Sequence, residues 1–301
     1  MAKMMTPAMQ HFAKKNARRA GKTYDPTYES WIRFTRNRTA IVGLLILLVM
    51  MVFVVAADWI APYDYSAYDA TTAYQGPSAE HLFGTDNYGR DLLSRCIYGA
   101  RYSLFISLLC VLAAFFSGGI LGIVAGYFGG RVDEIIMRSM DILQAIPSIL
   151  MAICITAALG NGVGPLVIAI MISSMPRMSK NCRAAILNVK NAEYVESSHA
   201  IGVGEIRMIV KHMIPNAVGV MVIYVVGMMS ASINIIASLS YMGCGLVPPT
   251  PEWGLILSEG KNFFITFPHM VLFPAGMILL TILAFNMLGD GLRDALDPRL
   301  K

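Results

Sequence analysis

The sequence predicts an all-α integral membrane protein with about six transmembrane helices and with both termini in the cytoplasm. Three observations predict this fold class. The mean hydropathy is +0.58, and 14% of the residues are charged, against roughly 25% in an ordinary soluble domain. The apolar residues are gathered in long runs, as helices that cross a hydrocarbon core about 30 Å thick require. Lysine and arginine lie mainly in segments that would face one side of the membrane.

Six apolar runs are the candidate transmembrane helices. They are Ile41–Ala57, Ser103–Tyr127, Ile142–Leu159, Pro165–Met175, Ala217–Leu239 and Met270–Leu288. The fourth run is the shortest, but it opens with a proline, which suits the first turn of a helix. Arg177, Lys180 and Arg183 follow this run, so we expect its helix to leave the membrane there.

The distribution of positive charge predicts the orientation, because cytoplasmic segments carry an excess of lysine and arginine. Of the 24 such residues, 20 fall before the first run, in the second and fourth connections and in the tail. Both termini are therefore placed in the cytoplasm. We expect the basic stretch from Lys14 to Lys22 to lie on anionic headgroups. No cleavage site follows the first apolar run, so we expect that span to be retained.

The chain divides into three predicted segments. Residues 1–38 form a cytoplasmic arm, residues 39–102 the first transmembrane helix with an extracytoplasmic loop, and residues 103–301 a five-helix core with a cytoplasmic loop at 190–215. The polar stretches leave no room for a soluble catalytic domain. The net charge of +5 needs no nucleic acid to explain it.

No catalytic motif is evident in the sequence. The nearest phosphate-loop candidate, Gly21-Lys22-Thr23, lacks the leading glycine that such a loop requires. Zinc-peptidase and serine-hydrolase motifs are not found either, and the five cysteines have no metal or disulfide spacing. We expect these cysteines to be small packing residues, and we expect the chain to be no enzyme and to bind no metal or cofactor.

Glycines at four-residue intervals in the second run predict close helix packing. Gly118, Gly122 and Gly126 would lie on one helical face, where a neighbouring backbone can approach closely. The acidic residues that follow, from Asp133 onward, stand in the first turn of a new helix, where the helix dipole favours them. We interpret that helix as a solvated cytoplasmic face.

The cytoplasmic connection near residue 200 contains a short amphipathic helix. Tyr194, Ser198 and Ile201 would lie on one side, Gly202 would form a turn, and Pro215 would end a second helix. Such a helix can be held through its apolar face in the groove of a partner, or it can rest in the membrane interface. The pattern alone does not separate these two interpretations.

This segment resembles the cytoplasmic coupling loop of ABC importer permeases, whose pattern is Glu-Ala-Ala, three residues, Gly and a later Pro. Glu196, Gly202 and Pro215 stand at the matching positions, and Ser197-Ser198 replaces the two alanines with other small residues. The residues that the resemblance assigns to contact with an ATPase are Tyr194, Glu196, Ser197, Ser198, Ile201, Gly202 and Pro215.

Three further segments resemble the same family, in the family's order. One resembles the signature of the peptide and nickel branch, through Gly84, Thr85, Asp86, Gly89, Arg90, Asp91 and Arg95. The others are Pro251-Glu252-Trp253-Gly254 in the last outer loop and the C-terminal stretch Gly289–Pro298. The resemblance covers nearly the whole chain and is closest to the C-type dipeptide and oligopeptide permeases. It implies the transmembrane domain of a type I ABC importer.

The outer motifs also have local physical interpretations. The charged residues from Asp86 to Arg95 could pair with one another on a helix at the outer surface, as a cover over the bundle or as a contact for the solute. Trp253 suits an interface that is apolar on one side and wet on the other. The functional alternative for Pro251, Glu252, Trp253 and Gly254 is a gate or a dock for a binding protein.

The resemblance implies a heteromeric importer in the cell membrane. Its expected partners are a second homologous permease, two ATP-binding subunits or domains that hold ATP and Mg, and an extracytoplasmic solute-binding protein. ATP would favour an outward-open conformation and hydrolysis would restore the other. Short peptides are the expected solute, and nickel or a metal chelate is the alternative.

Two other function classes carry less weight. A stand-alone secondary transporter would show inverted repeats or broken helices at corresponding positions, and we find neither in the sequence. A membrane enzyme would need a nucleophile with a base, or a metal cluster, within the spans. Gln144, Asn234 and Asn286 are polar enough to face a solute pathway, but each could equally form a hydrogen bond between helices.

Overall fold

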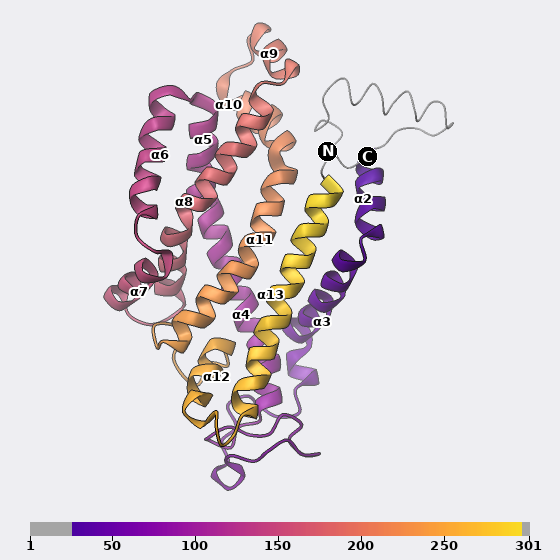
Figure 1. Cartoon of the computed structure of the whole chain (residues 1–301), viewed down its shortest axis with the longest axis vertical. Coiled ribbons are helices and arrows are strands. Elements are labelled where there is room, and N and C mark those ends of the chain that lie inside the picture. Colours follow the sequence, from indigo (N-terminus) through magenta and orange to yellow (C-terminus); the bar gives the residue numbers. More distant parts are fainter. Residues whose placement is uncertain (1–25, 297–301) are drawn as a thin grey trace.

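The computed structural model describes residues 26–296, and these residues form an elongated bundle of helices (Figure 1). The first half of the bundle contains α2 (Pro26–Arg36), α3 (Arg38–Ile60), η1 (Ala70–Thr72), α4 (Leu92–Ala114), η2 (Phe115–Gly119), α5 (Ile120–Phe128), α6 (Gly130–Gln144) and α7 (Ser148–Leu159). The second half contains α8 (Val163–Lys190), α9 (Glu193–Ala200), α10 (Glu205–Arg207), η3 (Met208–Met213), α11 (Ile214–Tyr241), α12 (Trp253–Gly260), η4 (Lys261–Phe263) and α13 (His269–Leu296). Within residues 26–296 the β pairing is one isolated bridge, between Thr85 and Asp91.

Four continuous helices of the described chain are long and apolar enough to cross a membrane. They are Arg38–Ile60, Leu92–Phe128, Glu205–Tyr241 and His269–Leu296, and they contain the first, second, fifth and sixth predicted runs. The second of them starts eleven residues before the predicted start, so the predicted domain boundary after residue 102 falls inside a helix. The predicted fourth run lies in α8. The total of six spans stays a prediction.

The third predicted run is not one straight helix. Its residues belong to the end of α6 and to α7, which form a bent pair with an angle of 81° at the break. Pro147 stands directly before α7, and proline restricts the residue before it to extended conformations. The hydropathy of the sequence did not distinguish α6 from α7, and the prediction of one continuous helix in this run was wrong.

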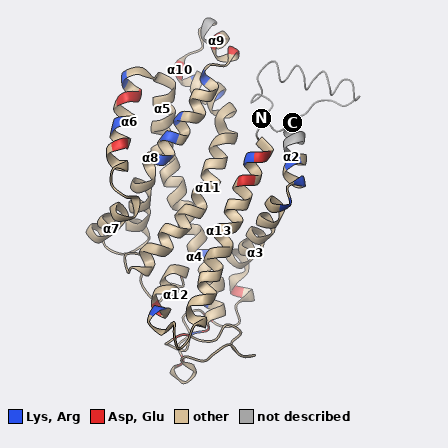
Figure 2. Cartoon of the chain, in the orientation of Figure 1, with Lys and Arg blue, Asp and Glu red and all other residues tan. Residues whose placement is uncertain are grey.

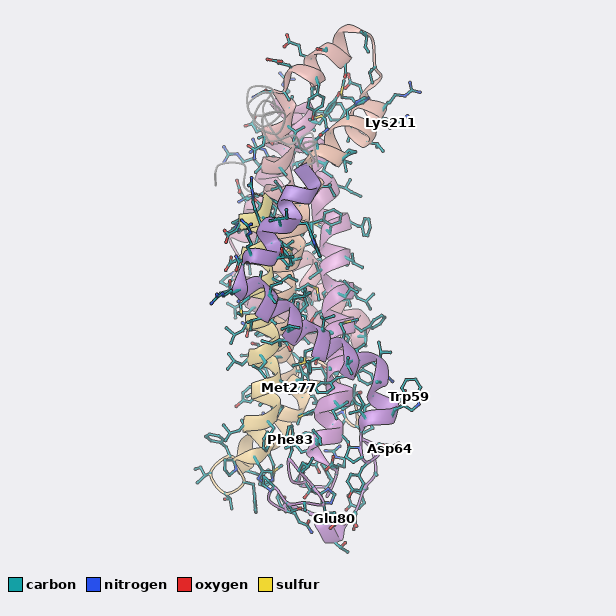
Figure 3. All side chains as sticks on the ribbon, turned by 90° about the vertical axis from the view of Figure 1, so that its right-hand side faces the viewer. Trp59, Asp64, Glu80, Phe83, Lys211 and Met277 are labelled. Carbon is teal, nitrogen blue, oxygen red and sulfur yellow. The ribbon has the colours of Figure 1, made fainter. Side chains whose placement is uncertain are left out.

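The described ends of the chain lie at the same end of the bundle. The start of α2 and the end of α13 lie towards the same end of the bundle as α9, whereas α12 and the loop before α4 lie at the opposite end (Figure 1). We call these the α9 end and the α12 end. Figure 3 shows Lys211 near the α9 end, and Asp64 and Glu80 at the α12 end. Residues 1–25 of the predicted arm lie outside the described residues. Which end of the bundle faces the cytoplasm stays a prediction.

Charged residues gather towards both ends of the bundle (Figure 2). At the α9 end, the guanidinium of Arg183 donates to Asp133 at 2.5–2.6 Å, and Lys180 pairs with Asp141 at 2.7 Å. These pairs join α6 to α8. The helix that the sequence suggested to be a solvated face is therefore attached to its neighbour through charges.

The first and last described helices are also joined. The side chain of Asn37 caps α3 and donates to Asp294 of α13 at 3.1 Å. Gly291 lies so close to α3 that an added Cβ would be 2.2 Å from the Cβ of Ala40. This part of the C-terminal motif packs against the start of the first span, and residues 297–298 of the motif lie outside the described residues.

The predicted close packing at the glycine stripe is confirmed. A Cβ added to Gly118 would lie 2.5 Å from the backbone oxygen of Met175, and a Cβ added to Gly122 would lie 2.1 Å from that of Ser179. Both oxygens belong to α8. The stripe therefore brings the backbones of η2 and α5 close to that of α8 over consecutive turns.

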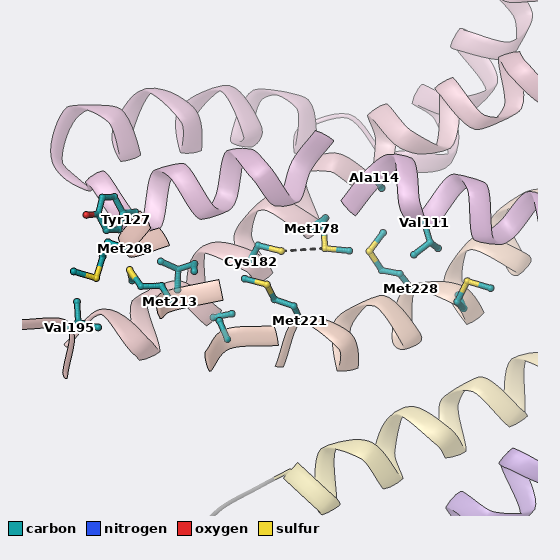
Figure 4. Close-up of a cluster of buried hydrophobic side chains, with 14 residues drawn as sticks. Val111, Ala114, Tyr127, Met178, Cys182, Val195, Met208, Met213, Met221 and Met228 are labelled. Atoms are coloured by element: carbon teal, nitrogen blue, oxygen red, sulfur yellow. Dashed lines mark hydrogen bonds between the residues drawn. The ribbon is translucent and has the colours of Figure 1, made fainter. Parts of the chain in front are cut away.

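The core at the α9 end is rich in methionine. One cluster of buried residues includes six methionines from α8, η3 and α11, together with Val195 and Tyr127 (Figure 4). Cys182 lies 3.7 Å from the sulfur of Met178 in this cluster. Cys96, Cys110 and Cys182 are buried as expected of packing residues, whereas Cys154 is exposed on α7.

Candidate functional site

The predicted ATPase-contact segment forms a protruding cap at the α9 end (Figure 1). Val195 is buried against the methionine cluster, and Tyr194 is half-buried beside it. Burial raises the pKa of Tyr194. Glu196 and Ser197 are exposed, and 81% of Ile201 is accessible. The helix thus faces the bundle with Tyr194 and Val195. Ser198 is half-buried like Tyr194, but Ile201 lies beyond the end of α9 and is exposed, so the predicted face does not extend to it.

The turn after α9 depends on glycine. Gly202 has φ +77°, and an added Cβ would meet no atom within 4 Å. Residues that carry a Cβ rarely adopt this left-handed backbone conformation. Glycine is therefore required here because of its φ angle and not because space is lacking. Ser197 and Ser198 each donate to the carbonyl four residues before, at 2.8 and 2.6 Å. The serines that replace the family's alanines are therefore satisfied within α9.

Pro215 does not end a helix as the sequence suggested. It stands in the first turn of α11, after a wide π-helical turn at Met208–Met213. A proline ring inside a regular helix would clash with the carbonyl four residues before it, and the wider turn makes room for the ring. As a result, Glu205–Tyr241 is continuous over 37 residues, from the α9 end to the far side of the bundle.

Three residues that the sequence analysis did not identify connect this segment to α5. The hydroxyl of Tyr127 donates to the carboxylate of Glu205, and the amine of Lys190 donates to the backbone oxygen of Tyr127. These residues, with Glu196, line an open groove of about 590 Å³. Periodicity could not have indicated this groove, because its residues come from α5, the end of α8, α9 and α10.

The charged motif at the α12 end forms a buried network. The carboxylate of Asp86 accepts from Arg90 at 2.6 Å and from Arg95 at 2.5 Å. Glu259 accepts from the same two arginines at 3.0 and 2.7 Å. The Arg95 side chain is fully buried. The predicted pairing is confirmed, but the network lies inside the structure and not on an exposed helix, because Glu259 of α12 covers it.

The remaining residues of this motif shape the loop around the network. Asp91 caps α4 by accepting from the backbone of Ser94 at 2.7 Å, and it also contacts His81 at 2.9 Å. Gly84 and Gly89 have φ +77° and +74°, and an added Cβ at either would lie within 2.5 Å of a backbone oxygen. Thr85 is fully buried. The whole motif thus holds the loop before α4 in one conformation.

Pro251, Glu252, Trp253 and Gly254 are all buried in the structure. The ring nitrogen of Trp253 donates to the carbonyl of Cys96 at 2.9 Å, and an added Cβ at Gly99 would lie 2.5 Å from the Trp253 ring. Trp253 was expected at a wet interface, and this was wrong because Gly99, far away in the sequence, opens a site for its ring. In this conformation the segment offers no surface on which a binding protein could dock.

Glu252 begins α12 as its N-cap. Its carboxylate accepts from the backbone of Gly254 and of Leu255, both at 2.9 Å, and from the hydroxyl of Ser103 at 3.3 Å. Burial raises the pKa of Glu252, and the two N–H donors oppose this rise. The segment fixes α12 against α4, so a role as a gate would require α12 and α4 to separate.

The three polar residues considered for a solute pathway lie in different surroundings. Asn286 accepts from the hydroxyl of Ser230 at 2.8 Å, which links α13 to α11. Asn234 is exposed on the bundle surface. Gln144, at the break between α6 and α7, accepts from Lys180. Among the described residues, no group of three histidine, cysteine, aspartate or glutamate side chains is placed to hold a metal ion.

Comparisons with known proteins identify the family. Residues 118–301 match the family described as the binding-protein-dependent transport system inner membrane component, and residues 26–77 match the N-terminal transmembrane domain of oligopeptide transport permease C. The glutathione transport system permease protein GsiD of Escherichia coli O6:K15:H31 is 42% identical over 277 residues, which cover 92% of this chain and 91% of the relative. The protein of the same name from Pectobacterium atrosepticum is 40% identical over 92% of each chain.

Two solved structures have a similar fold. One shows inward-facing conformations of the MetNI methionine ABC transporter, with a TM-score of 0.56 at 16% identity over 68% of this chain and 97% of that chain. The other is an amino acid ABC transporter with histidines, with a TM-score of 0.53 at 14% identity over 66% of this chain and 92% of that chain. The chain therefore belongs to the inner-membrane permeases of binding-protein-dependent ABC importers, in the dipeptide and oligopeptide branch.

Proposed function

We propose that this permease forms, with a second homologous permease, the path by which short peptides enter the cell after delivery by an extracytoplasmic binding protein. The observation that carries this proposal is the match over 92% of the chain to permeases named for glutathione, which is itself a tripeptide. The match to the N-terminal domain of oligopeptide permeases supports the same solute class. Membership of the family replaces the alternative of a stand-alone secondary transporter, although the structure does contain one broken helix, at α6 and α7.

In this proposal two ATP-binding partner subunits hold ATP and Mg and supply the energy. They contact the permease through the cap at the α9 end. The exposed residues of the cap support this contact, because the side chains of Ile201, Ile206 and Val210 are 81%, 79% and 59% accessible. An apolar face of this kind, in a segment rich in charge, can be held in the groove of a partner. Glu196 and the turn at Gly202 lie beside this face.

The solute is tested by uptake into vesicles that contain the whole complex and its binding protein. We expect ATP-dependent uptake of glutathione or of di- and tripeptides, and no uptake when the binding protein is omitted. The same vesicles are assayed with Ni²⁺ and with chelated nickel. ATP-dependent uptake of nickel without uptake of any peptide would contradict the proposed solute and establish the alternative.

The turn at Gly202 provides a test of the coupling contact. Changing Gly202 to alanine forces a side chain into the left-handed region, which costs roughly 1–2 kcal/mol, so we expect the turn to shift and ATP-driven uptake to fall about fivefold or more. Uptake and ATP hydrolysis are measured on the same vesicles, and copurified subunits are identified by mass spectrometry.

Gly204 is the matched control for this variant. It lies two residues away with an ordinary φ of −65°, and an added Cβ would also meet open space. Gly204→Ala should therefore leave uptake and copurification unchanged. If Gly202→Ala transports as well as Gly204→Ala, the turn does not act in coupling.

A further inference from the structure

A cavity of about 210 Å³ lies between α4, α8, α11 and the break that separates α6 from α7. It is open to one side, because Gln144, Ser148 and Arg177 in its wall are exposed in this single chain. Its wall carries an unusual share of polar side chains for this position in a membrane protein. They are Gln144, Ser148, Ser173, Ser174, Arg177 and Ser232. No aspartate or glutamate lines the cavity.

Helices α8 and α11 each line this cavity with one face. On α8 the lining positions are 170, 173, 174, 176 and 177, and on α11 they are 228, 231, 232 and 235. Both sets have the spacing of one continuous helical face. Polar residues on these faces therefore point to one shared space and not to scattered packing sites.

The length of α8 indicates that the cavity lies within the thickness of a membrane, near the side at which the sequence places the end of this span. The start of α8 is fixed at the α12 end, where the backbone of Gly162 donates to Gly245 at 3.2 Å. Arg177 is the fifteenth residue of α8, which places it about 21 Å along the helix, within a hydrocarbon core about 30 Å thick. A charged side chain at such a depth is costly, and it marks a pathway for a solute or an ion more often than a structural site.

The broken span supplies a second, independent indication that the cavity holds water or solute. The break between α6 and α7, with its angle of 81°, leaves backbone groups outside any helix at residues that line the cavity. Irregular backbone at this depth is tolerated only where protein covers it or where it lines a water-filled space. The first turn of α7 has no side-chain cap, so its free N–H groups and the positive end of its dipole are available at the cavity.

The charges around the cavity do not cancel. Lys180 is paired with Asp141 at 2.7 Å. Among the residues that the structure describes, no carboxylate lies within 4 Å of the guanidinium of Arg177. The hydroxyl of Ser232, a residue that is 3% exposed, has only the thiol of Cys110, a weak hydrogen-bonding group, as a partner in the described chain. An unpaired cation, a free helix N-terminus and a hydroxyl without a strong partner together favour an anionic group as the occupant.

We propose that this cavity is the contribution of this chain to the solute path, and that Arg177, with the N-terminus of α7 and the surrounding serines, receives a carboxylate of the passing solute. This inference rests on the proposed function and extends it by naming the residues that contact a peptide. The volume is below the roughly 300–1,000 Å³ of a pocket that encloses a whole ligand. The cavity therefore holds one end of the solute, and the second permease completes the path.

The test uses the complete complex in vesicles, with the five native cysteines replaced and Ser173→Cys introduced, one helical turn from Arg177. The probes are two thiosulfonate reagents of similar size, one with a sulfonate and one with a trimethylammonium group. Relative to their rates with a free thiol, we expect the sulfonate to react at least about fivefold faster, because the site is positive. Arg177→Gln should remove this preference, and Arg177→Lys should keep most of it.

Two control variants separate the site from its surroundings. Leu150→Cys places a thiol on α7 at an exposed residue that does not line the cavity, and its rates with the two reagents, relative to a free thiol, should be equal. Arg207→Gln removes an exposed positive charge at the α9 end, and it should leave the preference at residue 173 unchanged. If the thiol at 173 reacts with neither reagent, or if its preference survives Arg177→Gln, the inference is overturned.

The outcome is distinguishable from that of the proposed function. Free-acid peptides should protect the thiol at 173 from the sulfonate reagent, and Arg177→Gln should abolish this protection while the ATP-binding subunits still copurify. If the unaltered complex imports no peptide and the charge preference at 173 persists, the proposed solute is wrong and the anionic site stands.

Discussion

Replacing Arg95 with leucine is expected to destabilise the protein by about 3–5 kcal/mol, because it removes one partner from a buried ion pair and leaves carboxylates uncompensated. The guanidinium of Arg95 is fully buried and lies 2.5 Å from Asp86 and 2.7 Å from Glu259. Arg90 alone cannot neutralise both carboxylates. Thermal unfolding of the purified chain in detergent should show a midpoint lower by on the order of 10 °C.

An exposed pair at the same end of the bundle provides the control. Asp58 pairs with Arg101 at 3.0 Å, with side chains that are 59% and 36% exposed, and exposed pairs contribute little. Asp58→Asn should leave the unfolding midpoint nearly unchanged. Adding Glu259→Gln to Arg95→Leu should recover part of the loss, because one buried unpaired charge disappears. Strictly additive losses from the two changes would show that the network does not act as a unit.

Changing Gly122 to alanine is expected to force α5 and α8 apart. The new Cβ would lie 2.1 Å from the backbone oxygen of Ser179, and a backbone cannot move aside as a flexible side chain can. Overpacking of this kind typically costs 1–3 kcal/mol. We expect a lower unfolding midpoint in detergent and a smaller yield of assembled complex.

Gly227 in α11 is the comparison for this change. An added Cβ there would meet no atom within 4 Å, and alanine is a better helix former than glycine by up to about 1 kcal/mol. Gly227→Ala should therefore be neutral or slightly stabilising. Equal stability of the two alanine variants would mean that α5 and α8 are not in close contact.

Local patterns predicted much of this fold. The long apolar runs predicted the spanning helices, and the glycine stripe at residues 118–126 predicted the close contact with a neighbouring backbone. The turn at Gly202 and the charge pairing of Asp86 with Arg90 were also predicted. Each of these features depends on residues that are near one another in the sequence, or on the general preference of apolar helices for lipid.

Other features depend on partners that are distant in the sequence. The burial of Trp253 depends on the space above Gly99, and the burial of the charge network depends on Glu259. The cavity around Arg177 takes its wall from four separate helices, so no single periodic pattern indicates it. The proline at position 147 is evident in the sequence. An average of hydropathy over a window, however, does not indicate that the helix changes direction there.

The continuous helix Glu205–Tyr241 would act as a lever if it tilted as one body. Its 37 residues correspond to a length of about 55 Å, so a tilt of about 10° around its middle would move each end by roughly 5 Å in opposite directions. The wall residue Ser232 lies on this rod, and the contact with Tyr127 lies at its tip. A push on the cap at one end would therefore reach the opposite end as a swing of the same size, without any unfolding in between.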